Sequence, residues 1–133
     1  MKDNQLQICS FEQAQRLKAA GFDWEVSTTW YIHPDVSKCP YIIYDNNRLD
    51  WNKYTKYELS APTTALALKW MRDVKKRDGF VSVSLGKYHY SYFLGGWHGS
   101  WDEYHTVGFD DTYEAAESAL LDELLNVLET EKR

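Results

Sequence analysis

The amino-acid sequence predicts an α+β protein with helices packed on one face of antiparallel sheet. Three segments repeat their apolar residues with a helical period, and the segments between them alternate apolar and polar residues with a period of two. The resulting order is α-β-β-β-α-β-β-β-α. Helices laid on one side of an antiparallel sheet bury the apolar face of both, so this layered arrangement is expected.

The first helix is predicted to begin at Ser10 and to end at Gly21. Gln13 lies three residues after Ser10, and this spacing allows each side chain to bond the other residue's backbone N–H in a capping box. Glycine is the favoured residue just beyond a helix because it adopts the left-handed conformation without strain.

Two further helices follow from similar signals. The second is expected after Thr63, a plausible cap, and before Gly79. The third should start at Asp111 or Thr112, with Glu114 completing a capping box if Asp111 is the cap, and should run close to the C-terminus.

Six strands are predicted between the helices, with short turns at 45–47 and at Gly86-Lys87. They cover residues 24–32, 41–44, 49–57, 80–85, 88–94 and 104–109, and the pattern at 49–57 is irregular. Each half of the chain would then place a helix after a three-stranded meander. This pattern suggests a pseudo-repeat of about fifty residues that shares the central helix.

The length of 133 residues fits a single domain, covering residues 1–133, with a substantial core. Cys9 and Cys39 lack the spacing of a zinc or redox motif, which favours idle thiols in a reducing compartment. The N-terminus has no apolar run and no segment is long and apolar enough for a membrane span. We therefore expect a cytoplasmic protein with no membrane association.

Charge is distributed unevenly along the chain. Residues 1–101 carry 13 basic and 10 acidic side chains, whereas residues 102–133 carry 2 basic and 10 acidic ones. The second half shares its element order with the double-stranded RNA-binding domain, but that family opens its last helix with lysines, and here residues 110–114 are largely acidic. Nucleic acid is therefore not an expected partner.

Residues 95–105, GGWHGSWDEYH, are the most unusual stretch of the sequence. His98, Asp102 and His105 are potential metal ligands or catalytic groups, but their spacing matches no recurrent ligand pattern and no nucleophile motif is present. We expect a glycine-rich hairpin connection, with no catalytic residue, no metal and no cofactor.

Aromatic residues make up 16% of the chain and suggest a contact surface. Tyr88, Tyr90 and Tyr92 share one side of a predicted strand, although the period does not say which side faces water. If that side is open, the tyrosines join a binding surface that also includes Trp97, His98 and Trp101. Cross-strand packing that stabilises the sheet is the alternative for the same tyrosines.

The third helix carries apolar residues over about half of its circumference, which is more than one sheet face requires. Packing against another helix of the chain would cover the excess. A homodimer is the alternative, with an interface formed by Leu121, Leu125 and Leu128.

The helix starts at 10–14, 61–72 and 109–116 resemble those of small uncharacterised proteins encoded by phages and integrated elements of gut bacteria. This resemblance implies an accessory protein inside an infected or lysogenic cell, and it implies no activity or site. The function we predict is a non-enzymatic cytoplasmic interaction protein that engages another protein through its acidic C-terminal helix or its aromatic sheet and loop. The alternative is a module that binds a sugar or nucleotide by Trp and Tyr stacking.

Overall fold

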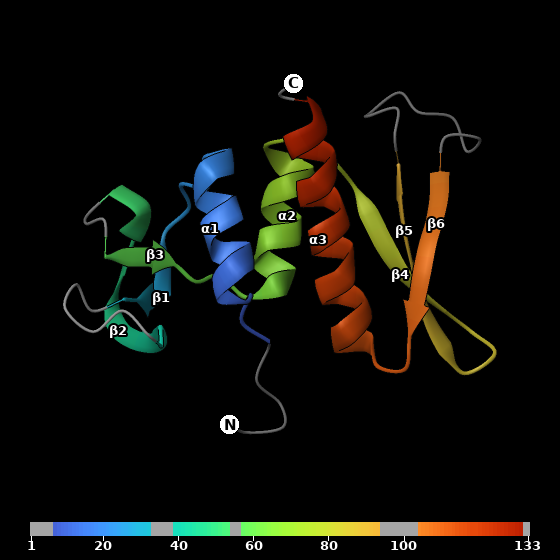
Figure 1. Cartoon of the computed structure of the whole chain (residues 1–133), viewed down its shortest axis with the longest axis horizontal. Helices are drawn as coiled ribbons and strands as arrows, with labels where there is room; N and C mark the ends of the chain where they lie inside the picture. The colour runs from blue at the N-terminus through green and yellow to red at the C-terminus, as the bar shows by residue number, and fades with distance from the viewer. Residues whose placement is uncertain (1–6, 33–38, 54–56, 94–103, 132–133) are drawn as a thin grey trace. The chain divides into compact units, whose positions relative to one another are not determined.

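The computed structural model describes two compact units, Met1–Thr63 and Thr64–Arg133 (Figure 1). Each unit holds one three-stranded antiparallel sheet and at least one helix. The expectation of a single domain remains a prediction. The described residues are 7–32, 39–53, 57–93 and 104–131.

The first unit begins with helix α1 (Phe11–Ala20). Ser10 Oγ accepts the Gln13 N–H at 3.1 Å, and Gln13 Oε1 accepts the Ser10 N–H at 2.9 Å, so the predicted capping box is confirmed. Gly21 has a φ of 97°, in the left-handed region that ends the helix. The sequence signals therefore fix both ends of α1.

The first sheet has the strand order β2-β1-β3, with β1 (Val26–Tyr31) in the centre. Strand β2 (Tyr41–Leu49) continues through residues 45–47, so the predicted turn there is wrong. The register between β1 and β2 shifts between Val26 and Thr28, and the longer β2 takes up the extra residues as an irregularity of the ladder.

The strand predicted at 49–57 is also wrong beyond Leu49, which ends β2, in the described residues 50–53 and 57. Trp51–Lys53 form a short 3-10 helix, η1, and the last strand of this sheet, β3, is confined to Glu58–Ser60. The Trp51 indole N–H donates to the Val26 carbonyl at 2.7 Å, and Asn52 joins the Phe22 carbonyl to the Ser60 N–H. These long-range bonds hold η1 in place of a strand.

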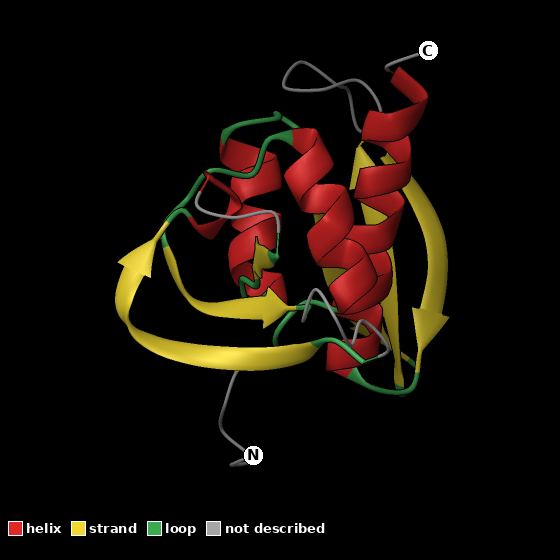
Figure 2. Ribbon diagram, turned by 60° about the vertical axis from the view of Figure 1, so that its left-hand side comes forward, coloured by secondary structure: helices red, strands yellow, loops and turns green. Residues whose placement is uncertain are grey.

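The second unit contains helix α2 (Thr64–Asp73), a three-stranded sheet and helix α3 (Tyr113–Glu131). Its strands β4 (Gly79–Ser84), β5 (Lys87–Phe93) and β6 (Tyr104–Asp110) lie in chain order as a meander. Helix α3 packs against all three strands and against α2 (Figures 1 and 2). Thr112 caps α3, because its Oγ1 accepts the Ala115 N–H at 3.1 Å.

The α+β class and the order α-β-β-β-α-β-β-β-α are confirmed. The prediction of a meander in both halves is wrong, because the first sheet places β1 between β2 and β3. After β2, the chain therefore crosses to the other side of β1, where β3 pairs with it. The two sheets share a strand number and an antiparallel sense but differ in strand order.

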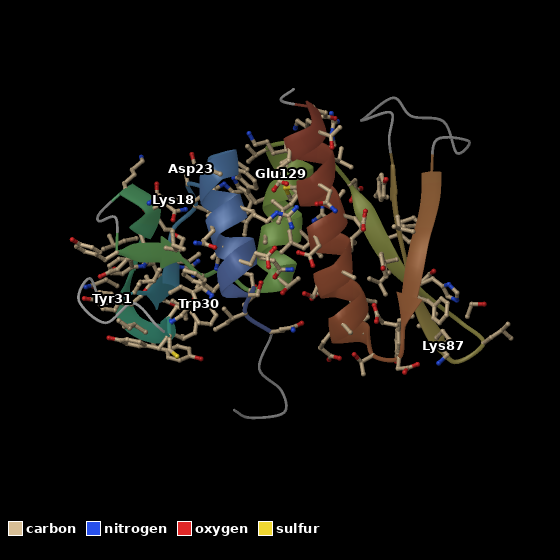
Figure 3. All side chains as sticks on the ribbon, in the orientation of Figure 1. Lys18, Asp23, Trp30, Tyr31, Lys87 and Glu129 are labelled. Atoms are coloured by element: carbon tan, nitrogen blue, oxygen red, sulfur yellow. The ribbon has the colours of Figure 1, made fainter. Side chains whose placement is uncertain are left out.

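Aromatic and leucine side chains form the core of the two units in different proportions. Phe22 and Trp51 are buried in the first unit, where the Trp30 indole donates to the Cys9 carbonyl at 3.0 Å (Figure 3). In the second unit α3 supplies a continuous apolar side. Its buried leucines are Leu120, Leu121, Leu124, Leu125 and Leu128. Among the described residues no helix is long and apolar enough to span a bilayer.

Candidate functional site

Of the predicted binding residues, the structure describes the tyrosines of β5 but not those of the 95–105 loop. Trp97, His98 and Trp101 lie outside the described residues, as does Asp102, and the His105 side chain is likewise not described. Tyr88, Tyr90 and Tyr92 lie on β5 as expected, with side chains of intermediate exposure. The surface that was predicted to combine the two groups is therefore described only in its β5 part.

The tyrosine row faces helix α3 and not the open side of the sheet. Gly79 pairs with Tyr92, and a Cβ atom on Gly79 would lie 2.6 Å from Leu120 Cδ1 of α3. The ring of Tyr88 packs edge-on against Tyr113 of α3, with centroids 6.1 Å apart. The structure thus favours the packing alternative for these tyrosines, because α3 covers the side that they share.

The Tyr90 side chain lies against the neighbouring strand β6 at Gly108. Its hydroxyl would be 2.6 Å from a Cβ at Gly108, so only glycine allows this approach. Burial raises the pKa of Tyr90, and the negative charges of Asp110, Glu123 and Asp122 raise it further. The hydroxyl therefore stays protonated at neutral pH and is not a candidate base or nucleophile.

The opposite face of the sheet carries a different set of side chains. His89 pairs with Phe109 across β5 and β6, and their rings are 5.7 Å apart. The Lys87 ammonium lies 5.9 Å from the Phe109 ring centroid, a cation–π distance. Phe109 nevertheless keeps 59% of its surface exposed, which is unusual for a phenylalanine in a strand.

The end of the β4–β5 hairpin adds an apolar residue in an unfavourable conformation. The two-residue loop consists of Leu85 and Gly86, with φ values of 53° and 76°. Two positive φ values define a type I′ turn, which strongly prefers Asn or Gly at the first position. Leu85 is 99% exposed, so no packing within the chain compensates for its strained backbone.

We call Leu85, Lys87, His89 and Phe109 the hairpin-end patch. Figure 3 labels Lys87 at this end of the sheet. Further along the same face Ser91 is fully buried, so the exposed area is concentrated near the hairpin. Lys87 also forms an ion pair with Asp111, and this hydrogen-bonded contact lowers the pKa of the Asp111 carboxyl. The patch is therefore mainly apolar and aromatic, and the positive charge of Lys87 is balanced by Asp111.

Sequence reasoning missed Leu85 and Phe109 as site residues. The signal for Leu85 was present, because Leu-Gly replaces the usual Asn-Gly between two alternating strands. Phe109 gave no comparable signal. Its face is determined by the register of β6 on β5 and by the position of α3, neither of which the sequence period contains.

The leucines predicted as a dimer interface are already covered within the chain. Leu121, Leu125 and Leu128 are 0%, 1% and 8% exposed. The broad apolar side of α3 is therefore not a free surface, and the reason for placing an interface there is removed. The oligomeric state itself remains a prediction.

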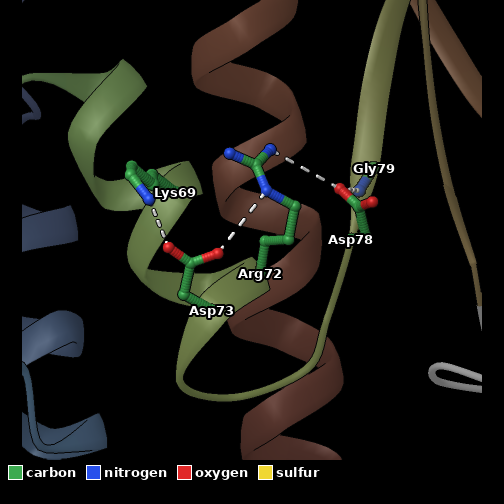
Figure 4. A network of polar contacts seen from close by, with 5 residues as sticks. All are labelled: Lys69, Arg72, Asp73, Asp78 and Gly79. Atoms are coloured by element: carbon green, nitrogen blue, oxygen red, sulfur yellow. Dashed lines mark hydrogen bonds and ion pairs between the residues drawn. The ribbon is translucent and has the colours of Figure 1, made fainter.

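The basic residues of α2 are engaged with acidic neighbours (Figure 4). Lys69 forms an ion pair with Asp73, whose pKa is lowered mainly by this hydrogen bond. Arg72 lies 3.8 Å from the Asp73 carboxylate and 3.9 Å from that of Asp78, which also accepts the Gly79 N–H at 2.8 Å. These contacts partly neutralise the positive charge of Lys69 and Arg72.

The described side chains were also compared with the requirements of a reactive thiol and of a metal site. Cys9 is buried, and burial raises the pKa of its thiol to about 12, which keeps it protonated and unreactive. The Asp50 carboxylate is largely buried but has Lys53 at 3.7 Å. Within the described ranges no group of three or more His, Cys, Asp or Glu side chains is arranged to hold a metal ion.

Comparison with known proteins gives no match. No protein-family model, curated protein or solved structure is significantly similar to this chain.

Proposed function

We propose that this chain is a non-enzymatic interaction protein that binds a protein partner through the hairpin-end patch. The observation that carries the proposal is the 59% exposed Phe109 ring, flanked by Lys87 and His89 on one face of the sheet. Aromatic side chains that are held in place by neighbours are frequent energetic centres of protein interfaces, because their burial releases much apolar surface at little entropic cost.

The conformation of Leu85 supports the same surface. A leucine at a φ of 53° costs about 1 kcal/mol or more relative to glycine or asparagine, and here the side chain gains no burial in return. A strained, fully exposed apolar residue is expected where the side chain contacts something outside the chain.

The acidic C-terminal helix supports a partner surface less well. Two carboxylates at the ends of this helix form ion pairs within the chain. Asp111, just before α3, pairs with Lys87, and Glu131, the last residue of α3, pairs with Arg77. The net negative charge is still suited to steer a basic partner toward the protein, but charge steering adds more to the rate of association than to affinity. We therefore assign the main contact to the hairpin-end patch.

The resemblance to small phage and integrated-element proteins suggests the cellular setting that we propose. The partner would then be a protein of the bacterial cell that carries the element. An apolar pocket on that partner is the expected complement of Phe109 and Leu85, with polar groups at its rim to meet Lys87 and His89.

The test compares what three tagged proteins capture from lysate of the host cell: wild type, Phe109→Ser and Tyr44→Ser. Tyr44 is 69% exposed on β2 and serves as a matched control for loss of an exposed aromatic ring. We expect one or more proteins that bind wild type and Tyr44→Ser but not Phe109→Ser. Equal capture by all three would refute the proposal.

Sugar or nucleotide binding is the second candidate function, and the exposed Phe109 ring is the described feature that supports it. A thermal-shift screen with mono- and oligosaccharides and nucleotides separates the two functions. A compound that raises the Tm of wild type but not of Phe109→Ser would favour the small-ligand function.

A further inference from the structure

Among the described strands, the outer edge of β4 differs from the outer edges of β2, β3 and β6. Exposed edges are usually protected by charges, bulges or short length, because their unpaired backbone groups can pair with another strand. Strand β2 has an irregular register, β3 has only three residues, and the β5–β6 ladder shifts between Tyr90 and Ser91. Strand β4 has none of these features.

The sequence of β4 is Gly-Phe-Val-Ser-Val-Ser, without a charge or a proline. Its six residues pair with β5 in continuous register, so the strand has no bulge. Phe80, Val81 and Val83 have high β-propensity. A regular, uncharged edge strand with such residues is the pattern expected at a site of strand addition.

The register of the hairpin determines which backbone groups of β4 point outward. Ser84 and Lys87 flank the two-residue loop and form a hydrogen-bonded pair. Alternation along an antiparallel ladder then directs the N–H and C=O groups of Val81 and Val83 away from β5. The Gly79 N–H is already used by the Asp78 carboxylate, at 2.8 Å.

We propose that two copies of this chain pair through β4, antiparallel and centred on Ser82, to form a continuous six-stranded sheet. In this register Val81 of each copy lies opposite Val83 of the other, and both outward rungs of each strand are satisfied. Val81 and Val83 lie symmetrically on either side of Ser82. A two-fold axis at Ser82 therefore pairs the outward N–H and C=O groups of both residues with those of the other copy.

The side chains are compatible with this pairing. Val81 and Val83 are on the α3 side of the sheet, where valine would meet valine, and the 67% exposed Val83 would be covered. On the other side Ser82 meets Ser82, and Phe80 meets Ser84. The pairing brings no like charges of β4 together. These features favour a second copy over a foreign strand as the occupant.

This inference is independent of the proposed function but adds to it. A two-fold axis through a continuous sheet is perpendicular to the sheet, so both hairpin-end patches would lie on the same side. A dimer would then present two patches to a partner and bind a multivalent surface with greater avidity.

Disulfide trapping tests the register. In the background Cys39→Ser, which removes the exposed thiol, Ser82→Cys places two thiols in a non-hydrogen-bonded pair with Cα atoms about 4.5 Å apart. Ser84→Cys is the matched control, since its two copies would be about 13 Å apart along the strands. Cys9 is buried and protonated, so it does not compete.

Under mild oxidation we expect a covalent dimer from Ser82→Cys and none from Ser84→Cys on a non-reducing gel. Light scattering should give wild type twice the 15.6 kDa mass of one chain. Val83→Pro should give a monomer, because it removes an outward N–H without breaking the ladder to β5, and Val83→Ala should stay dimeric.

A wild-type mass of 15.6 kDa at all concentrations, together with no cross-link from Ser82→Cys, would overturn the proposal. Equal cross-linking by Ser82→Cys and Ser84→Cys would also overturn it, because random collision would then explain both. The cysteine pair keeps the test decisive if Val83→Pro does not fold. Neither readout depends on Phe109, so failure here leaves the proposed function untouched.

Discussion

The two sheets of this protein have the same number of strands but are stabilised in different ways. The first sheet is held by directional bonds from side chains to distant backbone groups, donated by the Trp30 and Trp51 indoles and by the Asn52 amide. The second sheet is covered by the leucine side of α3, an apolar contact without direction. The directional bonds accompany an irregular β1–β2 ladder and the helix η1, whereas the β4–β5 ladder beside α3 has a continuous register.

The same difference is visible at the surface. The first sheet has the irregular β2 and the three-residue β3 at its edges, whereas the second sheet has the regular strand β4 at one edge. Both sheets expose an aromatic ring, Tyr44 in the first and Phe109 in the second, and the second also places Leu85 in water. On the side of the second sheet away from α3, Lys87 and Phe109 are exposed near the hairpin, whereas Ser91 is fully buried. Under the proposed function, the binding surface belongs to the second unit.

The largest expected effect is the loss of a leucine from the α3 layer. Leu124 is 1% exposed, and Leu124→Ala should lower the free energy of unfolding by about 2–5 kcal/mol through lost burial and a cavity. Urea denaturation measures this loss, and Val74→Ala, at a 46% exposed position, is the control with an expected change below about 1 kcal/mol.

Hydrogen exchange then tests the comparison between the two units. Amides of β5 should lose more protection in Leu124→Ala than amides of β1, because α3 packs on the second sheet. Equal loss in both sheets would mean that the two units unfold together, as expected for the single domain that the chain length predicts.

A smaller effect is expected from the first unit. Asn52→Ala removes the donor to the Phe22 carbonyl and the acceptor for the Ser60 N–H, and should cost about 1–3 kcal/mol of unfolding free energy. Asn52→Asp keeps the acceptor for the Ser60 N–H but removes the donor to the Phe22 carbonyl, so it separates the contributions of the two hydrogen bonds. A loss below about 0.5 kcal/mol would show that these directional bonds do not hold the first sheet.

Local signals in the sequence predicted the helices and the β4-β5-β6 meander. They failed where contacts between distant residues decide the structure. Ser10, Gln13 and Gly21 set the ends of α1 by contacts within a few residues. The turn expected at 45–47 lies within β2, and η1 replaces a strand because Trp51 bonds Val26, twenty-five residues away. No local pattern encodes such a bond.

The site was only partly predictable for a related reason. Alternation along β5 correctly grouped Tyr88, Tyr90 and Tyr92 on one side, but a period of two does not say which side a helix covers. The position of α3 decides this, and it leaves His89 and Phe109 on the open side. The unusual Leu85-Gly86 turn was the one local sign of the hairpin-end patch.

The smallest expected effect has the opposite sign and concerns Leu85. Leu85→Asn should raise the free energy of unfolding by about 1 kcal/mol, because asparagine adopts a positive φ at lower cost and the leucine side chain is 99% exposed. Leu85→Ala is the control, since alanine keeps the Cβ that causes the strain, and denaturant titration should show no gain for it. If binding is the reason for the leucine, Leu85→Asn should be more stable than wild type and should capture less of the partner that Phe109→Ser loses. A variant that is more stable and binds equally well would remove Leu85 from the hairpin-end patch and leave its strain without a functional explanation.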